Sequence, residues 1–387
     1  MRRILLVLAV IVVGTVGVVT AATAAGRGGD ATPALLARAA TLAYQPAAQA
    51  TGVPVTSPVT VSVTNGTLEQ VALTNPQGKQ VAGALNEDRR VWTSTEPLGY
   101  DTEYTWSGTA KGEDGVGVPL AGGFHTIVPK QQVRGVLNIG DGRTVGIAAP
   151  IEIQFNGHVE DRAAVERALS VQTSVPVEGA WGWLPDEAGG SRVHWRPKEY
   201  WPAGTKVSVS AKLYGVDYGG GQFGAADVTS DFQIGRAQVV KADARSHRMI
   251  VVRDGTQVAN YPASYGLADD PDRNTRSGIH VVTEKFTDKR MVSQQYGYDV
   301  VEKWAVRMSN NGEFIHANPA SANAQGSSNV THGCVNLSLE NAKAYYDTAL
   351  YGDPVEVTGT PVQLSARDGD VWDWTLSWDE WQRLTAL

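Results

Sequence analysis

The chain alternates apolar and polar residues with a period of two in residues 55–63, where valines recur at every second position over most of the run. This alternation is typical of a β-strand with one buried face. The turn dipeptide Asn65-Gly66 follows directly, so the sequence predicts a strand that leads into a hairpin. The same pattern returns in residues 150–157, which also end in Asn-Gly. The chain therefore contains a loose internal repeat.

The later parts of the two repeats also correspond. Residues 102–107 match residues 205–210, and the two segments close at Phe124 and Phe232. This spacing predicts two β-sandwiches of about a hundred residues each, of the immunoglobulin-like kind but without a cysteine pair. Residues 161–169 are expected to form a short helix on the second sandwich. Neither repeat contains a convergent set of acids, bases or metal ligands.

The pattern changes at about residue 237, where a third β-rich unit is predicted. Residues 248–253 form an apolar run that ends in Asp254-Gly255, a hairpin signal. A second hairpin is expected around Asn311-Gly312. Ser338 can cap a helix over residues 339–350, and residues 354–357 are expected to form a last strand.

Composition narrows the function classes. The chain has 387 residues, with 33 Lys and Arg against 40 Asp and Glu, so it lacks the positive charge typical of nucleic-acid binding. The 42 Gly and 18 Pro favour short strands and turns. The single cysteine, Cys334, excludes an internal disulfide, a multi-cysteine zinc site and an iron–sulfur cluster.

The N-terminus has the features of an export signal. Arg2 and Arg3 precede an apolar run over residues 4–19, and residues 22–24 fit a cleavage site of the A-x-A kind. The run is also about long enough to remain as a membrane anchor. We therefore expect an exported protein at the outer face of the cytoplasmic membrane or in the cell wall. It would contact the membrane only through this segment, if the segment is not cleaved.

Cys334 is the candidate nucleophile. A free thiol is mostly protonated at neutral pH, so a catalytic cysteine needs a neighbouring base. His332 lies two residues before Cys334, and His316 lies eighteen residues before it; the spacing alone does not choose between them. Gly333 leaves the adjacent backbone N–H groups open, as an oxyanion hole requires. The alternative is an inert, buried thiol.

Residues 312–316 and 331–336, read together, resemble the active-site signature of the bacterial L,D-transpeptidases with a YkuD-type catalytic domain. The resemblance extends over the chain, because actinobacterial members combine a signal or anchor, immunoglobulin-like modules, the catalytic domain and a Trp-rich C-terminal piece. Four tryptophans lie within residues 372–381, and we expect them to dock the tail onto the catalytic domain. The expected organisation is a signal or anchor with linker at 1–33, immunoglobulin-like modules at 34–129 and 130–236, the catalytic domain at 237–358, and the Trp-rich segment at 359–387.

The resemblance implies roles for individual residues. Cys334 would be the nucleophile and His316 its base. Tyr298 would help the oxyanion hole, and a role of residue 317 would be played through the backbone carbonyl, because Ala317 stands where relatives often have Ser. Ala320 stands where some relatives have Trp. The full set of expected oxyanion and substrate-binding residues is Tyr298, Asn311, Gly312, Ala317, His332, Gly333 and Asn336.

The resemblance also implies an activity. Such an enzyme cross-links peptidoglycan stem peptides through a cysteine thioester, releases D-Ala, needs no metal or cofactor, and is acylated by carbapenem β-lactams. Two alternatives remain open on the sequence. One is a secreted Cys/His peptidoglycan hydrolase, an L,D-carboxypeptidase in which water resolves the thioester. The other is a non-catalytic wall-binding protein built from immunoglobulin-like modules.

Overall fold

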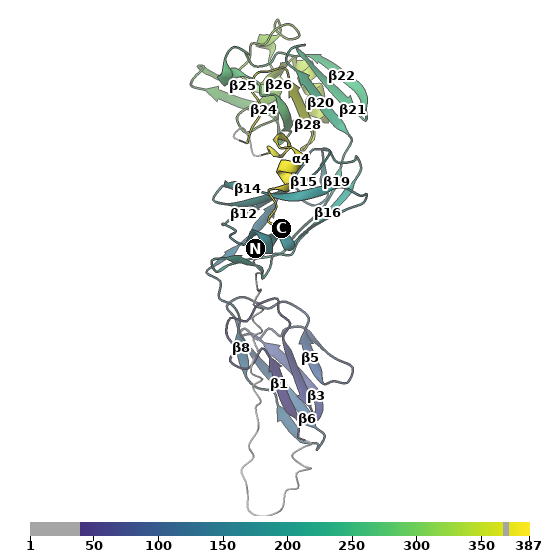
Figure 1. Ribbon diagram of the computed structural model, residues 1–387, viewed down its shortest axis with the longest axis vertical. Helices are drawn as coiled ribbons and strands as arrows, with labels where there is room; N and C mark the ends of the chain where they lie inside the picture. Colours follow the sequence, from purple (N-terminus) through teal and green to yellow (C-terminus); the bar gives the residue numbers. More distant parts are fainter. Residues whose placement is uncertain (1–38, 367–370) are drawn as a thin grey trace, which may run out of the picture. The chain divides into compact units, whose positions relative to one another are not determined.

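The computed structural model describes residues 39–366 and 371–387, so the predicted export segment lies outside the described residues. The fold is mainly β, as predicted. The chain divides into two compact units, one that ends at Gln132 and one that begins at Val133 (Figure 1). No helix in the described ranges has the length and apolar character needed to cross a bilayer. The predicted domain boundaries themselves stay predictions.

The first unit is a pair of β-sheets. Trp92 on one sheet and Trp106 on the other meet edge to face, with ring centroids 5.4 Å apart, and both rings are buried between the sheets. One sheet has the order β1-β2-β5-β4, with β1 (Thr41–Gln45), β2 (Thr60–Thr64), β5 (Val91–Ser94) and β4 (Gly83–Leu85). The other contains β3 (Gly66–Thr74), β6 (Glu103–Gly112), β7 (Gly117–Pro119) and β8 (Gly123–His125).

The hairpin predicted at Asn65-Gly66 is wrong. The turn exists, and Asn65 adopts a positive φ of 56°, but it joins strands of different sheets. β2 pairs with β1 and β5, whereas β3 pairs with β6. Residue patterns reveal a turn and a buried face, but they do not reveal which strand a segment pairs with.

The first half of the second unit is another β-sandwich with its own core. This core is rich in aromatic side chains, including Phe155, Trp183 and Trp195. The predicted helix is present as α2 (Arg162–Arg167), capped by the Asp161 side chain. One sheet has the order β10 (Gly135–Leu137), β12 (Ile151–Phe155), β15 (Gly190–Pro197) and β14 (Gly179–Glu187). The second has β11 (Thr144–Val145), β19 (Val228–Ile234), β16 (Lys206–Ala211) and β13 (Leu169–Thr173). A small third sheet has β17 (Asp217–Gly219), β18 (Gln222–Gly224) and β9 (Gln131–Val133), the strand whose last residue begins this unit.

The second half of this unit contains two further sheets around a separate apolar core. A five-stranded sheet has the order β22 (Thr256–Pro262), β21 (Arg248–Arg253), β20 (Gln238–Asp243), β28 (Pro354–Thr358) and β23 (Gly278–Val281). A four-stranded sheet has the order β24 (Glu284–Ser293), β25 (Tyr298–Arg307), β26 (Phe314–Ala317) and β27 (Val335–Leu337). The short 3-10 helices η1 (Pro271–Arg273) and η2 (Pro319–Ser321) lie in the connecting loops.

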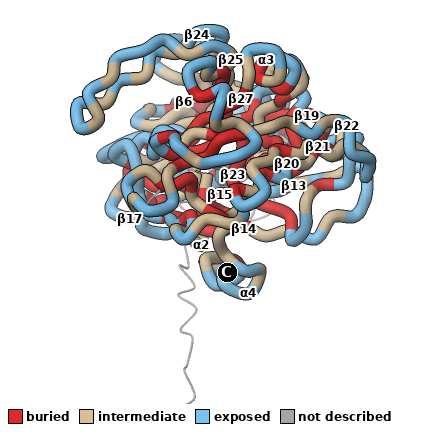
Figure 2. Tube along the Cα trace, turned by 90° about the horizontal axis from the view of Figure 1, so that it is seen from above, coloured by how far each residue is buried: buried red, intermediate tan, exposed pale blue. Residues whose placement is uncertain are grey.

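The predicted local elements of this half are confirmed. β21 and β22 pair across the Asp254-Gly255 turn, and β25 and β26 form the second hairpin. Helix α3 (Leu339–Thr348) begins at Ser338, whose side chain accepts a hydrogen bond from the Asn341 N–H. α3 packs on the core through Ala342 and Tyr345. In Figure 2, β27 lies in a buried stretch, whereas the β24–β25 hairpin is exposed or half-buried along most of its length.

The Trp-rich tail packs mainly on the second sandwich, and this corrects the expectation that it docks onto the predicted catalytic domain. Helix α4 (Trp378–Gln382) packs on β14, and Trp381 is fully buried there against Leu184 (Figure 1). The indole of Trp381 donates a hydrogen bond to the Ala180 carbonyl at 3.0 Å. The Arg196 guanidinium lies 4.7 Å from the ring of Trp374 and 5.1 Å from that of Trp381. The indoles pack on the second sandwich because Leu184 on β14 offers apolar surface and Arg196 on β15 offers a cation to their rings.

The 3-10 helix η3 (Asp373–Thr375) carries a buried ion pair in the same tail. The Asp373 carboxylate lies 2.9 Å from His194 Nδ1, and both side chains are almost fully buried. Burial by itself would lower the pKa of His194, but Asp373 and Glu152 together raise it. The tail is thus attached to the second sandwich by packing and by charge.

Replacing Trp381 by alanine is expected to destabilise the second unit by about 3–5 kcal/mol, because a fully buried indole leaves a cavity and an unpaired carbonyl. Urea unfolding of the variant measures the loss. The exposed Leu387 in the same tail supplies the control variant Leu387→Ala, which should change the free energy of unfolding by less than about 0.5 kcal/mol. A loss below about 1 kcal/mol for Trp381→Ala would contradict this docking.

Candidate active site

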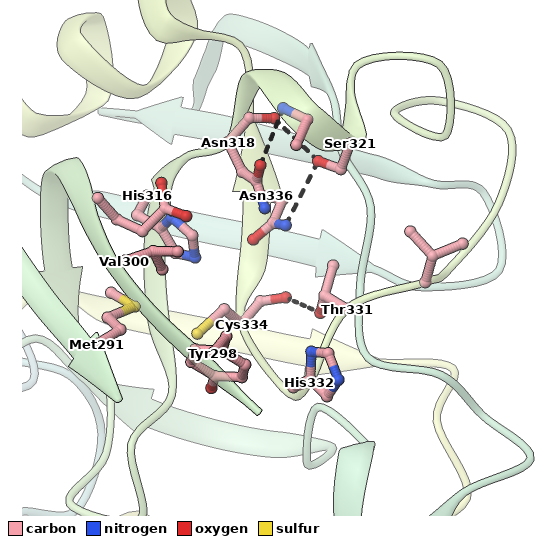
Figure 3. Close-up of a pocket in the computed structure, with 13 residues that line it drawn as sticks. Met291, Tyr298, Val300, His316, Asn318, Ser321, Thr331, His332, Cys334 and Asn336 are labelled. Atoms are coloured by element: carbon pink, nitrogen blue, oxygen red, sulfur yellow. Dashed lines mark hydrogen bonds and ion pairs between the residues drawn. The ribbon is translucent and has the colours of Figure 1, made fainter. Parts of the chain in front are cut away.

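The pairing of two short strands brings the candidate histidine and cysteine together. β26 and β27 are parallel neighbours, with His316 directly opposite Asn336. Cys334 immediately precedes β27, so its side chain lies next to the strand that carries His316. Figure 3 shows the imidazole of His316 and the sulfur of Cys334 facing one another across the site.

Both side chains open into one cavity of about 320 Å³. Five of the predicted site residues line it: Tyr298, His316, His332, Cys334 and Asn336. Ala320 also lines it, so the wall is formed there by a methyl group. The other four predicted site residues do not line the cavity and lie in the chain segments next to it: Asn311, Gly312, Ala317 and Gly333. The other lining residues are Met291, Val300, Glu302, Asn318, Ser321, Val330 and Thr331.

The imidazole of His316 is held by its Nδ1 atom. Nδ1 lies 2.9 Å from the Ala317 carbonyl oxygen, which can only accept, so Nδ1 carries the proton. The Nε2 atom is then left for the sulfur. Burial alone would lower the pKa of His316, but hydrogen bonds to the side chains of Cys334 and Glu302 and to the Ala317 carbonyl raise it to about 10. These contacts favour the charged, imidazolium form of His316.

Cys334 is partly exposed and has carbonyl and amide groups around its sulfur. The Sγ atom lies 3.6 Å from the Gly312 carbonyl oxygen. The backbone N–H groups of Gly333 and Cys334 donate no hydrogen bond to any other described residue. Gly333 has a φ of +107°, and an added Cβ would lie 3.3 Å from the Asn274 carbonyl oxygen. Only glycine adopts this conformation without strain, so the free N–H groups depend on it.

Hydrogen bonds hold the two loops that carry these groups. The Thr331 hydroxyl donates to the Cys334 carbonyl at 2.6 Å, and Arg273 donates to the Val330 and Thr331 carbonyls. On the other side, the buried Glu313 carboxylate accepts from the Arg276 N–H at 2.9 Å and from the Ser309 hydroxyl at 3.0 Å. Ser309 is also hydrogen-bonded to Asn311. These bonds fix the turn that presents the Gly312 carbonyl.

Asn336 and Tyr298 supply polar atoms to the cavity. The Asn336 Nδ2 atom donates to the Ser321 hydroxyl at 3.4 Å, whereas its buried Oδ1 atom has no partner among the described residues. Burial, followed by the charge of Cys334, raises the pKa of Tyr298, so its phenol stays protonated and can donate. The unpaired Asn336 Oδ1 and the Tyr298 phenol thus belong to two residues that line the same cavity as Cys334 (Figure 3).

The structure distinguishes the two histidines. The ring of His332 packs on two tyrosines, with centroid distances of 4.4 Å to Tyr296 and 5.4 Å to Tyr298. Partial burial, together with the charge of Arg273, lowers the pKa of His332. A histidine that stays neutral in an aromatic stack is suited to contact a ligand. His316, in contrast, has the raised pKa and the contact with sulfur.

The sequence reasoning missed Glu302, Asn318 and Ser321, which line the cavity, and Glu313 beneath it. A signal for Glu302 was available, because Tyr298, Val300 and Glu302 alternate along β25 and so share a face. Ser321 and Asn318 lie in or next to η2, where no periodic pattern exists. Among residues 39–366 and 371–387, no cluster of three or more His, Cys, Asp or Glu could hold a metal ion.

Comparison with known proteins places this chain among related sequences. The family described as the L,D-transpeptidase catalytic domain matches residues 237–357, and the family described as a bacterial Ig domain matches residues 50–217. L,D-transpeptidase 5 of Mycobacterium tuberculosis is 58% identical, over 89% of this chain and 77% of that protein. L,D-transpeptidase 2 of the same species is 37% identical, over 86% and 82%.

A solved structure is similar as well. The LD transpeptidase LdtMt1 in complex with imipenem is 33% identical, with a TM-score of 0.50, and the similarity covers 59% of this chain and all of that one. The identity and coverage of the two mycobacterial relatives are well beyond what a shared fold alone produces. The chain therefore belongs to the L,D-transpeptidase family, with the catalytic domain following a bacterial immunoglobulin-like region.

Proposed function

We propose that this L,D-transpeptidase acts on peptidoglycan stem peptides through a thioester on Cys334, with His316 as its proton-transfer partner. The observation that carries the proposal is the arrangement of His316. Its Nδ1–H is bound to the Ala317 carbonyl, and its other nitrogen faces the only sulfur of a cysteine in the chain.

The first step is acylation of the thiol. His316 takes the Cys334 proton, and the thiolate attacks the carbonyl carbon of the third residue of a stem tetrapeptide. The negative oxygen that forms can accept hydrogen bonds from the N–H groups of Gly333 and Cys334, with the Tyr298 hydroxyl as a further donor. The imidazolium then gives its proton to the nitrogen of D-Ala, which leaves as the carbon–nitrogen bond breaks.

The second step transfers the acyl group to an amine. The side-chain amine of a neighbouring stem attacks the thioester, His316 takes a proton from the attacking nitrogen, and the thiolate leaves. The product is a cross-link between two third-position residues. The free Oδ1 of Asn336 can accept from an amide N–H of a bound stem, and His332 lies at the cavity wall, where it can contact the peptide.

The same thiolate would open a β-lactam ring. The similar enzyme LdtMt1 is described in complex with imipenem, and the cavity around Cys334 is open to solvent on one side. We propose that carbapenems acylate Cys334. The substrate and the basic, apolar N-terminal sequence together support a place outside the cytoplasm, at the membrane surface or in the cell wall.

Product analysis from a defined tetrapeptide donor and an acceptor stem tests the proposal. Mass spectrometry should find D-Ala and a dimer joined between two third-position residues. A tripeptide without dimer would show that water resolves the thioester and would favour an L,D-carboxypeptidase. Absence of both products would favour a non-catalytic wall-binding protein.

A further inference from the structure

A carboxylate lies behind the catalytic imidazole. The Oε2 atom of Glu302 is 3.6 Å from the Nδ1 atom of His316, and the two side chains are 16% and 4% exposed. Glu302 faces the cavity because it shares a face of β25 with Tyr298 and Val300. His316 Nδ1 thus lies between two acceptors, a neutral carbonyl at 2.9 Å and a charged carboxylate slightly farther away.

The two acceptors act differently on the two protonation states. The carbonyl orients the ring by accepting a hydrogen bond from Nδ1–H, whereas the carboxylate, 3.6 Å from Nδ1, adds a negative charge that stabilises the imidazolium more than the neutral imidazole. Burial strengthens this charge effect, because little water separates the groups. The contact with Glu302 is among the causes that raise the pKa of His316.

The other ionisable groups around the imidazole leave this role to Glu302. Cys334 is the proton donor itself, and Tyr298 keeps its proton because burial and the charge of Cys334 raise its pKa. Lys289 is paired with Glu302 across the β24–β25 ladder. Its ammonium, however, lies over the rings of Phe286 and Phe314, at 4.3 and 5.9 Å.

We propose that Glu302 is a positioning residue that completes a Cys334–His316–Glu302 array by stabilising the charged form of the imidazole that the Ala317 carbonyl orients. The inference rests on the proposed thioester function. The proton moves only between the Cys334 sulfur, His316 Nε2 and the substrate nitrogens. Glu302 stays a carboxylate throughout, and His316 Nδ1 keeps its own proton.

The variant Glu302→Gln tests the charge at nearly constant shape. The rate of alkylation of Cys334 by iodoacetamide should be measured against pH in the full chain. We expect the rate at neutral pH to fall about tenfold, as for loss of one charge-assisted contact. The rate at strongly alkaline pH, where the thiolate forms without help from His316, should stay at the wild-type value. The control Glu284→Gln alters a carboxylate at the open end of the hairpin, where it pairs with Arg307, and should keep the wild-type profile.

Two results would overturn the inference. One is a Glu302→Gln profile that coincides with the wild-type profile, and the other is a rate that falls equally at every pH, which would indicate a merely structural role. Glu302→Ala provides an independent test. Sodium formate should restore its rate at neutral pH more than sodium chloride does at equal ionic strength, and equal effects of the two salts would contradict a carboxylate role.

D-Ala release and the alkylation profile together separate this inference from the proposed function. If Cys334→Ala retains D-Ala release, the thioester mechanism itself fails, whatever Glu302 does. If Cys334→Ala is inactive but Glu302→Gln keeps the wild-type pH profile, only the role of Glu302 fails.

Discussion

Cys334→Ala is expected to reduce D-Ala release from a stem tetrapeptide by at least about 10⁴-fold, the scale on which enzymes lose activity without their nucleophile. The methyl side chain of alanine has no sulfur atom on which the acyl intermediate can form. Cys334→Ser should be comparably inactive, because a serine hydroxyl in the same place does not ionise beside an imidazole as a thiol does. A continuous assay of free D-Ala measures both variants.

The folding of these variants needs its own check. The Cys334 side chain is partly exposed, so its loss should change the thermal midpoint by only a few degrees, as about 1 kcal/mol does. A correctly folded Cys334→Ala protein with more than about 1% of wild-type D-Ala release would contradict a thiol nucleophile.

His316→Gln is expected to lower kcat for D-Ala release by about 10³-fold, within the range for loss of a general acid and base. Glutamine can accept and donate hydrogen bonds, but it cannot shuttle a proton between the sulfur and the leaving amine. The comparison variant is His332→Gln. Because His332 packs on Tyr296 and Tyr298 at the cavity wall, its loss should act mainly on KM, with kcat reduced less than about tenfold. A larger kcat loss for His332→Gln than for His316→Gln would reverse the assignment.

The raised pKa of His316 also has a consequence for the pH dependence of the wild-type enzyme. The imidazolium that protonates the leaving amine is present below the pKa of about 10 and is lost as the pH rises through it. D-Ala release should therefore persist through the neutral range and decline above about pH 10. Its measurement between neutral and alkaline pH tests the sign of the shift, and a decline centred near the ordinary histidine pKa would contradict it.

Features of the fold could be predicted where a few adjacent residues determine them. Ser338 before the helix and Asp254-Gly255 between two strands specify a cap and a hairpin within a few residues, and both are present. Asn65-Gly66 specifies a turn equally well. Whether the strands it joins pair with each other depends on competition among all the strands of the unit, which a local pattern does not contain.

The candidate site could be predicted in part for the same reason. A lone cysteine with glycine and histidine beside it indicates chemistry, but the choice between His316 and His332 depends on the parallel pairing of β26 with β27. That pairing is not encoded at short range. The surface on which the tryptophans pack could not be predicted either, because a cluster of indoles indicates packing but does not indicate the partner. Glu302 comes close to His316 only because β25 pairs with β26, the strand that carries the histidine.

The most direct test of the central claim is the covalent intermediate. The enzyme should be mixed with a tetrapeptide donor without an acceptor, quenched in acid, digested and analysed by mass spectrometry. The account predicts that the peptide containing Cys334 gains the mass of the acyl tripeptide, and that hydroxylamine removes this mass as it does from a thioester. Release of D-Ala with an unmodified Cys334 peptide, or with the acyl group on another residue, would contradict it.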